Sequence, residues 1–406
     1  MTEWRRLKLG AVITLKRGHD IRAVDRKEGT VPVVSSSGIV GYHNEAKVSA
    51  PGVVTGRYGT IGEVFFISEP FWPSNTTLYV EDFKGNDPYF VFYLLQQVDF
   101  RKYSDKTGVP GINRNDVHKA WVLLPPLPEQ RAIAAILGTW DRAIALRERR
   151  LAAAEQRKKA LMQQLLTGRV RFTEFVKSTE RQKTKYGDLP ADWRIVHLES
   201  VAEVNAESIS ESSKPNRKYL YIDLSSVDRG IITMPTEHQA FVDLPSRARR
   251  ILHKGDVIMA TVRPNLLGFA VCDFEPENVL CSTGFALISP KESPDSQFIY
   301  QSLYSDMILK QVYGLVTGSN YPAINASEVK KLWFVWPTSA EERRKIAAVL
   351  NACDRELDLL RRRRDALQRQ KKGLMQRLLT GRVRVGGPGG SGGPELKPQG
   401  QTHEAP

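Results

Sequence analysis

The sequence predicts an α/β protein with two mixed globular regions and two long helices. A stretch of 43 residues, 129–171, returns 213 positions later as 342–384 without a gap. The two copies share 24 identical residues, which is far more than a common helical pattern would give. One non-repeating region precedes the first copy and another separates the copies. The chain therefore consists of two half-proteins.

Each copy is predicted to form one long helix. Its apolar residues recur in steps of four and three over about four and a half heptads, which is the a/d pattern of a coiled coil. A helix of roughly 35–40 residues spans about 50–60 Å, which suits a spacer better than an element of a compact core. Two matching seams in one chain most simply pack on each other, as an antiparallel pair. The residues expected to pair the helices are Ile133, Leu137, Trp140, Ile144, Leu161, Leu165, Ile346, Leu350, Leu357, Leu374 and Leu378.

Charged residues interrupt both seams. Arg147 and Lys158 stand at seam positions in the first copy, and Arg364 and Lys371 in the second. Polar residues at such positions usually fix the register of a helix pair at some cost in stability. We therefore expect these residues to define how the helices are aligned.

The two globular regions share a ground plan more than a sequence. Each has short β-rich runs punctuated by Gly and Pro, one helical stretch, and a last apolar strand that leads into its repeat helix. The expected strands are 31–37, 52–59, 62–68, 76–82 and 120–126 in the first region, and 218–224, 255–262, 269–274, 285–290 and 331–337 in the second. The helical stretches are 88–98 and 298–312.

Pro128 is suited to a first helical turn and marks the start of the first repeat helix. After this helix, a polar and charged segment is expected to be a flexible or loosely packed linker. The Gly/Pro-rich end of the chain has nothing to bury and is expected to be disordered. The predicted parts are a first globular domain at 1–126, a repeat helix at 127–171, the linker at 172–188, a second globular domain at 189–338, a repeat helix at 339–385 and the tail at 386–406.

The chain is strongly basic. Its 59 Lys and Arg residues exceed 45 Asp and Glu residues, which gives a net charge of +14 and a pI near 9.6. This balance favours a polyanionic partner such as nucleic acid, although basic runs on helices are often solvated faces. The three cysteines lack CxxC spacing and support neither disulfides nor a zinc site. The N-terminus lacks the apolar stretch of a signal peptide and no long apolar run occurs, so we expect a soluble cytoplasmic protein without a membrane partner.

Motifs for catalysis are weak. The sequence contains neither a GxxxxGK[ST] phosphate loop nor the [DNS]PP[YFW] run of amino-methyltransferases, and GRYGTIG at 56–62 has the wrong spacing for GxGxxG. Asp295, Glu328 and Lys330 imitate the PD...ExK pattern of metal-dependent nucleases, which arises often by chance in a charged chain. We therefore predict no catalytic and no metal-binding residues, and keep a nuclease as the enzymatic alternative.

Recognition of DNA requires Arg, Lys, Asn and Gln side chains on loops that reach base edges and phosphates. The candidates in the first region are Lys16, Arg17, Arg57, Tyr58, Lys106, Asn113 and Arg114. The candidates in the second region are Arg247, Arg249, Arg250, Arg263, Asn265, Ser319, Asn320 and Tyr321. Each could instead be an ordinary exposed charge or turn residue. Arg57 and Arg263 are favoured, because each follows an apolar strand in the corresponding loop of its region.

The order of globular region, Pro-led helix, divergent globular region and repeated helix resembles the specificity (S) subunit of type I restriction-modification enzymes. The resemblance covers the chain up to the tail and is carried by Pro126–Leu137, the LLTGRVR helix ends at 165–171 and 378–384, the LPADW motif at 189–193, and the TG...IN loops at 107–113 and 317–325. One departure is WPTSAEER before the second helix, where the first has PLPEQR. This departure puts the equivalence of the two helices as docking surfaces in doubt.

The resemblance implies a non-catalytic DNA-recognition subunit. Its two globular domains would be target-recognition domains, each binding one half of an asymmetric, bipartite site in double-stranded DNA. The helices would set the gap between the halves and dock two methyltransferase subunits, with two restriction subunits where the complex has them. The chain would hold no cofactor, and S-adenosylmethionine, ATP and Mg2+ would act in the partner subunits. The alternative of a different class is a coiled-coil scaffold that binds proteins without specific DNA recognition.

Overall fold

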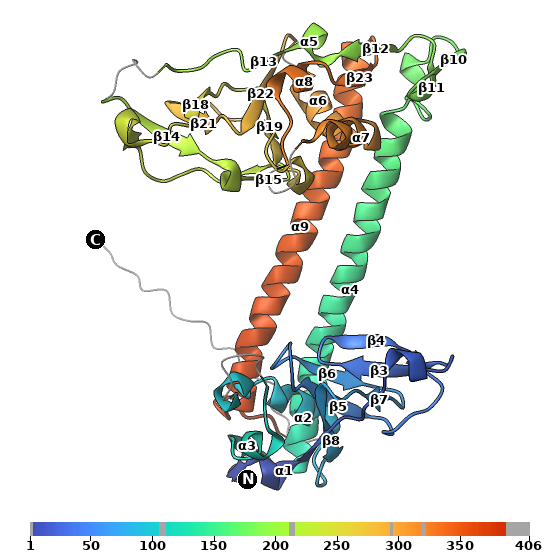
Figure 1. The fold of residues 1–406 in the computed structure, drawn as a ribbon, viewed down its shortest axis with the longest axis vertical. Coiled ribbons are helices and arrows are strands. Elements are labelled where there is room, and N and C mark those ends of the chain that lie inside the picture. Colours follow the sequence, from blue (N-terminus) through green and yellow to red (C-terminus); the bar gives the residue numbers. More distant parts are fainter. Residues whose placement is uncertain (1–2, 105–110, 211–215, 293–294, 318–321, 387–406) are drawn as a thin grey trace. The chain divides into compact units, whose positions relative to one another are not determined.

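The computed structural model describes residues 3–104, 111–210, 216–292, 295–317 and 322–386 (Figure 1). The chain divides into unit 1, formed by Met1–Glu148 with Arg362–Pro406, and unit 2, formed by Arg149–Arg361. The two predicted long helices are present as α4 (Leu127–Leu165) and α9 (Ala340–Leu379). Each of them contributes one part to each unit. The predicted tail lies outside the described residues, except for its first residue.

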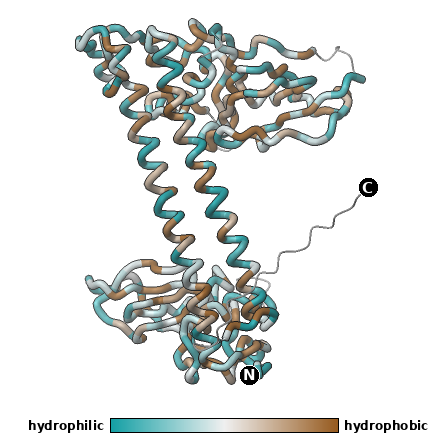
Figure 2. Tube along the Cα trace, turned by 180° about the vertical axis from the view of Figure 1, so that it is seen from behind, coloured by the Kyte–Doolittle hydropathy of each residue, from teal (hydrophilic) through white to brown (hydrophobic). Residues whose placement is uncertain are grey.

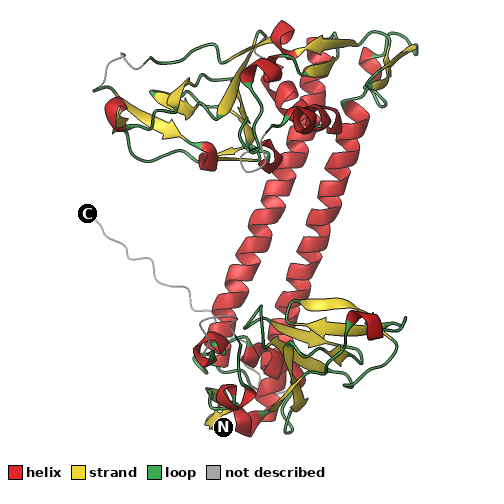
Figure 3. Cartoon of the chain, viewed as in Figure 1, coloured by secondary structure: helices red, strands yellow, loops and turns green. Residues whose placement is uncertain are grey.

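Unit 1 is rich in antiparallel strands (Figure 3). Its strands are β1 (Arg5–Lys8), β2 (Thr14–Arg17), β3 (Val31–Ser35), β4 (Gly38–His43), β5 (Gly52–Gly56), β6 (Val64–Ile67), β7 (Trp72–Pro73), β8 (Thr77–Asp82) and β9 (Trp121–Leu124). Its short helices are α1 (Leu9–Val12), α2 (Pro88–Leu95) and α3 (Arg114–Val117), with 3-10 turns at Ala23–Asp25 and Phe100–Tyr103. The sheets have the orders β2-β8-β5-β6, β4-β3-β7 and β1-β9, and only β3 and β7 run parallel.

Unit 2 has the same plan with more strands. Its strands are β10 (Arg181–Thr184), β11 (Gly187–Pro190), β12 (Arg194–His197), β13 (Ala202–Val204), β14 (Lys218–Ile222), β15 (Val227–Asp228), β16 (Ile231–Ile232), β17 (Gln239–Ala240), β18 (Ala248–Ile251), β19 (Val257–Ala260), β20 (Phe269–Val271), β21 (Val279–Ser282), β22 (Phe285–Pro290) and β23 (Trp333–Trp336). Its short helices are α5 (Leu198–Val201), α6 (Ser296–Leu303), α7 (Asp306–Leu315) and α8 (Ala326–Lys330), with 3-10 turns at Thr173–Phe175, Leu224–Ser226, Phe241–Asp243 and Pro264–Leu266.

Sheet order confirms that the two globular regions share one α/β fold. The antiparallel sheet β13-β22-β19-β20 of unit 2 answers β2-β8-β5-β6 of unit 1, and the ribbon β12-β23 answers β1-β9. Every predicted β-rich run contains a strand. One predicted element differs, because the single helix expected at 298–312 is two helices, α6 and α7. Ser305 separates them, since its hydroxyl caps α7 by accepting a hydrogen bond from the Ile308 amide.

Apolar residues recur along both long helices between polar ones (Figure 2). In unit 1, Ile133 and Leu137 of α4 and Leu378 of α9 belong to the core of the globular domain. In unit 2, the same holds for Leu165 of α4 and for Ile346 of α9. A small cluster within unit 2 consists of helix residues alone, namely Leu151, Ala154, Leu357 and Leu360. The helix ends are therefore parts of compact cores, in contrast to the expectation of pure spacers.

The charged seam residues Lys158 and Lys371 form matching ion pairs. In unit 2 the Lys158 ammonium lies 2.5 Å from the Asp354 carboxylate, and in unit 1 the Lys371 ammonium lies 2.5 Å from Asp141. The two lysines are equivalent in the repeat, and so are the two aspartates. Unit 2 adds a pair between Arg361 and Glu155, so residue numbers rise along α4 as they fall along α9. The helices are thus antiparallel.

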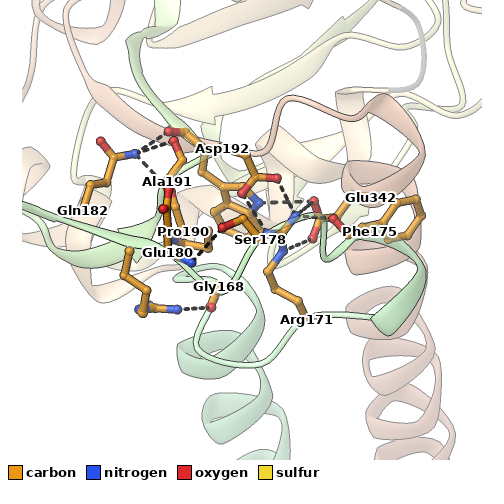
Figure 4. A network of polar contacts seen from close by, with 12 residues as sticks. Gly168, Arg171, Phe175, Ser178, Glu180, Gln182, Pro190, Ala191, Asp192 and Glu342 are labelled. Atoms are coloured by element: carbon orange, nitrogen blue, oxygen red, sulfur yellow. Dashed lines mark hydrogen bonds and ion pairs between the residues drawn. The ribbon is translucent and has the colours of Figure 1, made fainter.

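A cluster of polar contacts closes the helix pair of unit 2 (Figure 4). The Arg171 guanidinium donates to both oxygens of Glu342, at 2.8 and 2.9 Å, and to both oxygens of Asp192, at 2.8 and 2.9 Å. The indole of Trp193 also donates to Glu342, at 3.2 Å. The end of one repeat is thereby bonded to the start of the other.

Unit 1 repeats this closure with the equivalent residues. Arg384 donates to both oxygens of Glu129, at 2.8 and 2.9 Å, and the Trp4 indole donates to Glu129 at 2.9 Å. The arginine lies over its tryptophan at 5.5 Å from the ring centre, as Arg171 does over Trp193. The repeated sequence therefore encodes a repeated set of contacts.

The segment expected to be a flexible linker forms a bonded hairpin instead. Strands β10 and β11 pair antiparallel, and Arg181 donates to the carbonyl of Gly168 at 3.0 Å (Figure 4). Gln182 donates to the carbonyls of Pro190 and Trp193, at 3.0 and 2.7 Å. Gly168 has a φ of +62°, and a Cβ there would lie 2.5 Å from Pro190, so only glycine fits. The charge of this segment serves local bonds that composition does not reveal.

Candidate nucleic-acid interface

Six of the seven candidates from the first region line one groove of unit 1, which we call the basic groove. Its volume is about 580 Å³. The candidates in it are Lys16, Arg17, Arg57, Tyr58, Asn113 and Arg114, and the other lining residues are Leu78, Tyr103, Gly111, Ile112 and Asp116. Lys106 lies outside the described residues. Four of the lining side chains are cations and one is an acid, so the groove favours an anionic ligand.

The groove forms where three segments meet. Lys16 ends an edge strand, Arg57 follows the buried strand β5, and the third segment precedes α3. The Ile112 amide donates to the carbonyl of Arg57 at 3.0 Å and joins two of the segments. A Cβ at Gly111 would lie 2.2 Å from the Tyr58 ring, so glycine permits this close approach.

Arg57 is held in place by stacking. Its guanidinium carbon lies 4.4 Å from the centre of the Tyr58 ring, within the range of a cation–π contact. Among the described residues, no carboxylate forms an ion pair with Arg57. A guanidinium oriented by an aromatic ring, with its donors uncommitted, is suited to the two acceptors of guanine.

Lys16 and Arg17 lie at the exposed side of the groove and already have acidic partners. Lys16 is 2.5 Å from Glu81, and Arg17 donates to both oxygens of Asp20 at 3.0 and 3.1 Å. The hydrogen bond with Glu81 raises the pKa of Lys16 above its ordinary value, so the side chain stays cationic. Exposed ion pairs are weak, and a DNA phosphate can replace these carboxylates.

Asn113 has a structural task beside any role in binding. Its Oδ1 accepts a hydrogen bond from the Asn115 amide at 2.9 Å and caps α3. Only the NH2 group of Asn113 remains for a ligand. Arg114 follows it on the exposed surface of the same groove.

In unit 2 the corresponding loop holds its arginine at a different position. The Ile324 amide donates to the carbonyl of Thr261 at 2.9 Å, as Ile112 does to Arg57 in unit 1. The backbone counterpart of Arg57 is therefore Thr261, and Arg263 follows two residues later in the same loop. Sequence alignment placed the loop correctly but not the register within it.

The loop that carries Arg263 is strained. Arg263 has a φ of +51° and Leu267 a φ of +59°, although neither is glycine. Such left-handed residues cost about 1–3 kcal/mol each and cluster at functional sites. The Arg263 amide donates to the Pro322 carbonyl at 2.7 Å, and the side chains of Arg263 and Asn265 are exposed. Candidates Ser319, Asn320 and Tyr321 lie outside the described residues.

The remaining candidates of the second region lie on another sheet. Arg249 and Arg250 belong to β18, and Arg247 directly precedes it. Arg250 donates to Ser208 at 2.9 Å, and burial lowers its pKa. Arg249 lies 5.1 Å from the centre of the Phe241 ring. The structure thus groups these arginines with each other and not with the Arg263 loop.

One groove residue was missed from sequence. Tyr103 ends a 3-10 turn and lines the basic groove. The run FRKYSDK at 100–106 places this aromatic side chain among cations, a composition common in nucleic-acid surfaces. That local signal would have identified it.

Comparison with known proteins decides the family. A family model described as "Type I restriction modification DNA specificity domain" matches residues 1–156 and 190–369. The chain belongs to this family. It is a DNA specificity subunit of a type I restriction-modification system, and such a subunit recognises DNA without catalysing the reaction.

Individual relatives agree with this assignment. The type I restriction enzyme MjaVIII specificity subunit of Methanocaldococcus jannaschii is 27% identical over 334 residues, which cover 80% of this chain and 77% of that protein. The crystal structure of the type I restriction-modification system S subunit from M. genitalium is similar over 93% of this chain and 96% of that chain, with a TM-score of 0.60 and 15% identity. At this identity the similarity concerns the fold.

In this specificity subunit the residues of the nuclease-like pattern have structural partners. Asp295 accepts two hydrogen bonds from the buried Arg343, at 2.6 and 3.0 Å. Glu328 accepts from the Asn325 amide at 2.7 Å and completes a capping box at the start of α8. These contacts explain both carboxylates without a metal. Of the described helices, none combines the length and hydrophobicity that a bilayer span requires.

Proposed function

We propose that the two units bind unlike halves of an interrupted site in double-stranded DNA, unit 1 through the basic groove and unit 2 through the Arg263 loop. The observation that supports this most strongly is the gathering of Lys16, Arg17, Arg57 and Arg114 in one groove. The backbone counterpart of Arg57 in unit 2 is the neutral Thr261. Different chemistry at equivalent positions favours different base sequences.

The helices and their flanks would dock two methyltransferase subunits, and two restriction subunits where the complex has them. S-adenosylmethionine, ATP and Mg2+ would then act in those partners. Gln130 and Arg343 occupy the same repeat position, yet Gln130 donates to Asn86 whereas Arg343 pairs with Asp295. This difference supports docking surfaces that are alike but not identical.

The test combines the purified chain with the methyltransferase subunit encoded beside it and maps methylated bases on genomic DNA. We expect methylation only from the combination, at an interrupted motif with two different halves. A continuous or palindromic motif, or methyl transfer by the chain alone, would contradict the proposal. Binding of proteins without sequence-specific, salt-sensitive DNA binding would instead identify a scaffold.

A further inference from the structure

Unit 2 contains a second pocket, remote in sequence from the candidate DNA loops. It lies where the end of α4, helix α7 and the tip of the β10-β11 hairpin meet, and its volume is about 640 Å³. Its apolar wall includes Met162 and Leu166 of α4, Met307 and Ile308 of α7, and Phe334 of β23. Methionine side chains adapt to varied apolar partners, so this wall is suited to receive side chains from another protein.

The edge of this pocket carries excess positive charge. Lys159, Arg169, Lys185 and Lys310 line it, against the single carboxylate of Asp306. In the described part of the chain, none of these four cations forms an ion pair. Asp306 itself accepts a hydrogen bond from Gln163 at 3.3 Å. An acidic ligand would therefore meet four cations without first displacing a carboxylate from them.

One wall of the pocket is preformed by the hairpin. Lys185 at its tip lies 4.5 Å from the centre of the Trp333 ring, which His197 covers at 3.6 Å. The bonds of Arg181 and Gln182 described above fix the hairpin to the end of α4 and to the chain before β12. A fixed wall lowers the entropic cost of binding a partner.

Unit 1 repeats the helix face but not the pocket. Lys159, Met162, Leu166 and Arg169 of α4 have identical counterparts in and just after α9, namely Lys372, Met375, Leu379 and Arg382. However, a short 3-10 turn follows α2 where α7 follows α6. Among the described residues of unit 1, no hairpin covers Trp121, the counterpart of Trp333, which is 57% exposed. The extra elements of unit 2 thus turn a repeated helix face into a concave site.

We propose that this pocket docks an acidic segment with apolar side chains, contributed by one of the two methyltransferase subunits. This inference rests on the proposed function and adds an asymmetry to it, because only one copy of the partner would make this contact. The charge of the edge requires carboxylates, and the apolar wall requires side chains that a DNA backbone lacks. A protein segment satisfies both conditions.

The repeat supplies a matched control for the test. K159E/R169E reverses two cations at the pocket, and K372E/R382E reverses the same residues at the equivalent positions of unit 1. All four side chains are exposed, so each variant is expected to fold. K185E/K310E changes the pocket without touching a repeat helix. Native mass spectrometry and titration calorimetry then measure both steps of methyltransferase-subunit binding to the full chain.

We expect both pocket variants to weaken one of the two binding steps by at least about tenfold, with the loss reduced at high salt, while K372E/R382E leaves both steps unchanged. A photo-crosslinker at position 310 should capture an acidic, apolar segment of the methyltransferase subunit. Equal losses in K159E/R169E and K372E/R382E, or normal binding by K185E/K310E, would overturn the proposal. Weaker DNA binding by the pocket variants alone would identify nucleic acid as the occupant. Failure of the unaltered chain to bind any methyltransferase subunit would contradict the proposed function itself.

Discussion

At the scale of single residues, the repeat places the same carboxylate in two environments. Glu342 and Glu129 are equivalent and both accept from an arginine and a tryptophan. The arginine partner is 7% exposed in unit 2 and 40% exposed in unit 1. Because water screens exposed charges, the same ion pair should contribute less to stability in unit 1.

Glu129 should make the stability of unit 1 depend on pH. Burial opposes its ionisation, but the hydrogen bonds from Arg384 and Trp4 prevail and hold its pKa below the usual value. A depressed carboxyl pKa stabilises the fold above the unfolded-state value of about 4.3, and this contribution is lost as the pH falls through the folded-state pKa. E129Q should therefore flatten the acid limb of the unfolding free energy measured by urea titration. The exposed variant E148Q on the same helix is the control, and an equal effect there would refute the assignment.

Arg57 and Arg263 should each determine the bases of one half-site. R57A removes an arginine oriented by Tyr58, and a base-contacting arginine typically supplies about 1–3 kcal/mol of discrimination. R263A should affect the other half only. Methylation or binding on DNA libraries with each half randomised measures both effects. K16A is the control, because loss of a phosphate contact weakens all sequences alike. Unchanged base preferences in R57A would exclude the basic groove as the site of recognition.

At the scale of elements, sequence predicted what is local and missed what depends on distant partners. The long helices and the strands follow from apolar spacing, so they were found. The β10-β11 hairpin was not, because its order depends on Gln182 reaching the carbonyls of Pro190 and Trp193. The register of the Arg263 loop was also hidden, since it is set by a backbone bond between Ile324 and Thr261. Such bonds leave no periodic signal.

The ion pair between Lys158 and Asp354 should specify helix register more than stability. Replacing both residues by leucine removes a costly desolvation and is expected to leave the unfolding free energy within about 1 kcal/mol or raise it. D354A alone should destabilise unit 2, because Lys158 is largely buried and loses its carboxylate. Unfolding in urea distinguishes these outcomes.

Register itself can be measured in the same variants. Cysteines placed at positions 155 and 361, whose native side chains form an ion pair, should be joined by a short bismaleimide when the register is native. A slip of one heptad displaces them by about 10 Å. We expect the double leucine variant to lose part of this crosslink, and full retention would show that the apolar seam alone fixes the alignment.

At the scale of the whole molecule, a repeated frame carries unlike recognition surfaces. The closures at Glu129 and Glu342 and the lysine pairs of the helices are the same in both units. The loops differ, with Arg57 in one unit and Thr261 at the matching place in the other. Such a division lets the recognition surfaces change while the contacts that hold the helices together stay constant.

The helices should act as a ruler for the gap between the two half-sites. Inserting one heptad after Glu155 and one after Gln368 lengthens both helices between the two lysine pairs, so Lys158 keeps Asp354 and Lys371 keeps Asp141. The a/d spacing is preserved, and each helix grows by about 10 Å. At roughly 3.4 Å per base pair, this corresponds to about three base pairs of extra gap.

The outcome depends on rotation as well as distance, because DNA turns by roughly 100° over three base pairs. Unit 2 could then face the wrong side of the duplex, and activity could fall even on DNA with the longer gap. Methylation by the insertion variant on a library of gap lengths is the measurement, with unfolding in urea as the control for folding. A shifted optimum, or loss of methylation with the fold intact, fits a ruler. An unchanged preference for the original gap would show that the loops of the globular domains, and not the helices, set the distance.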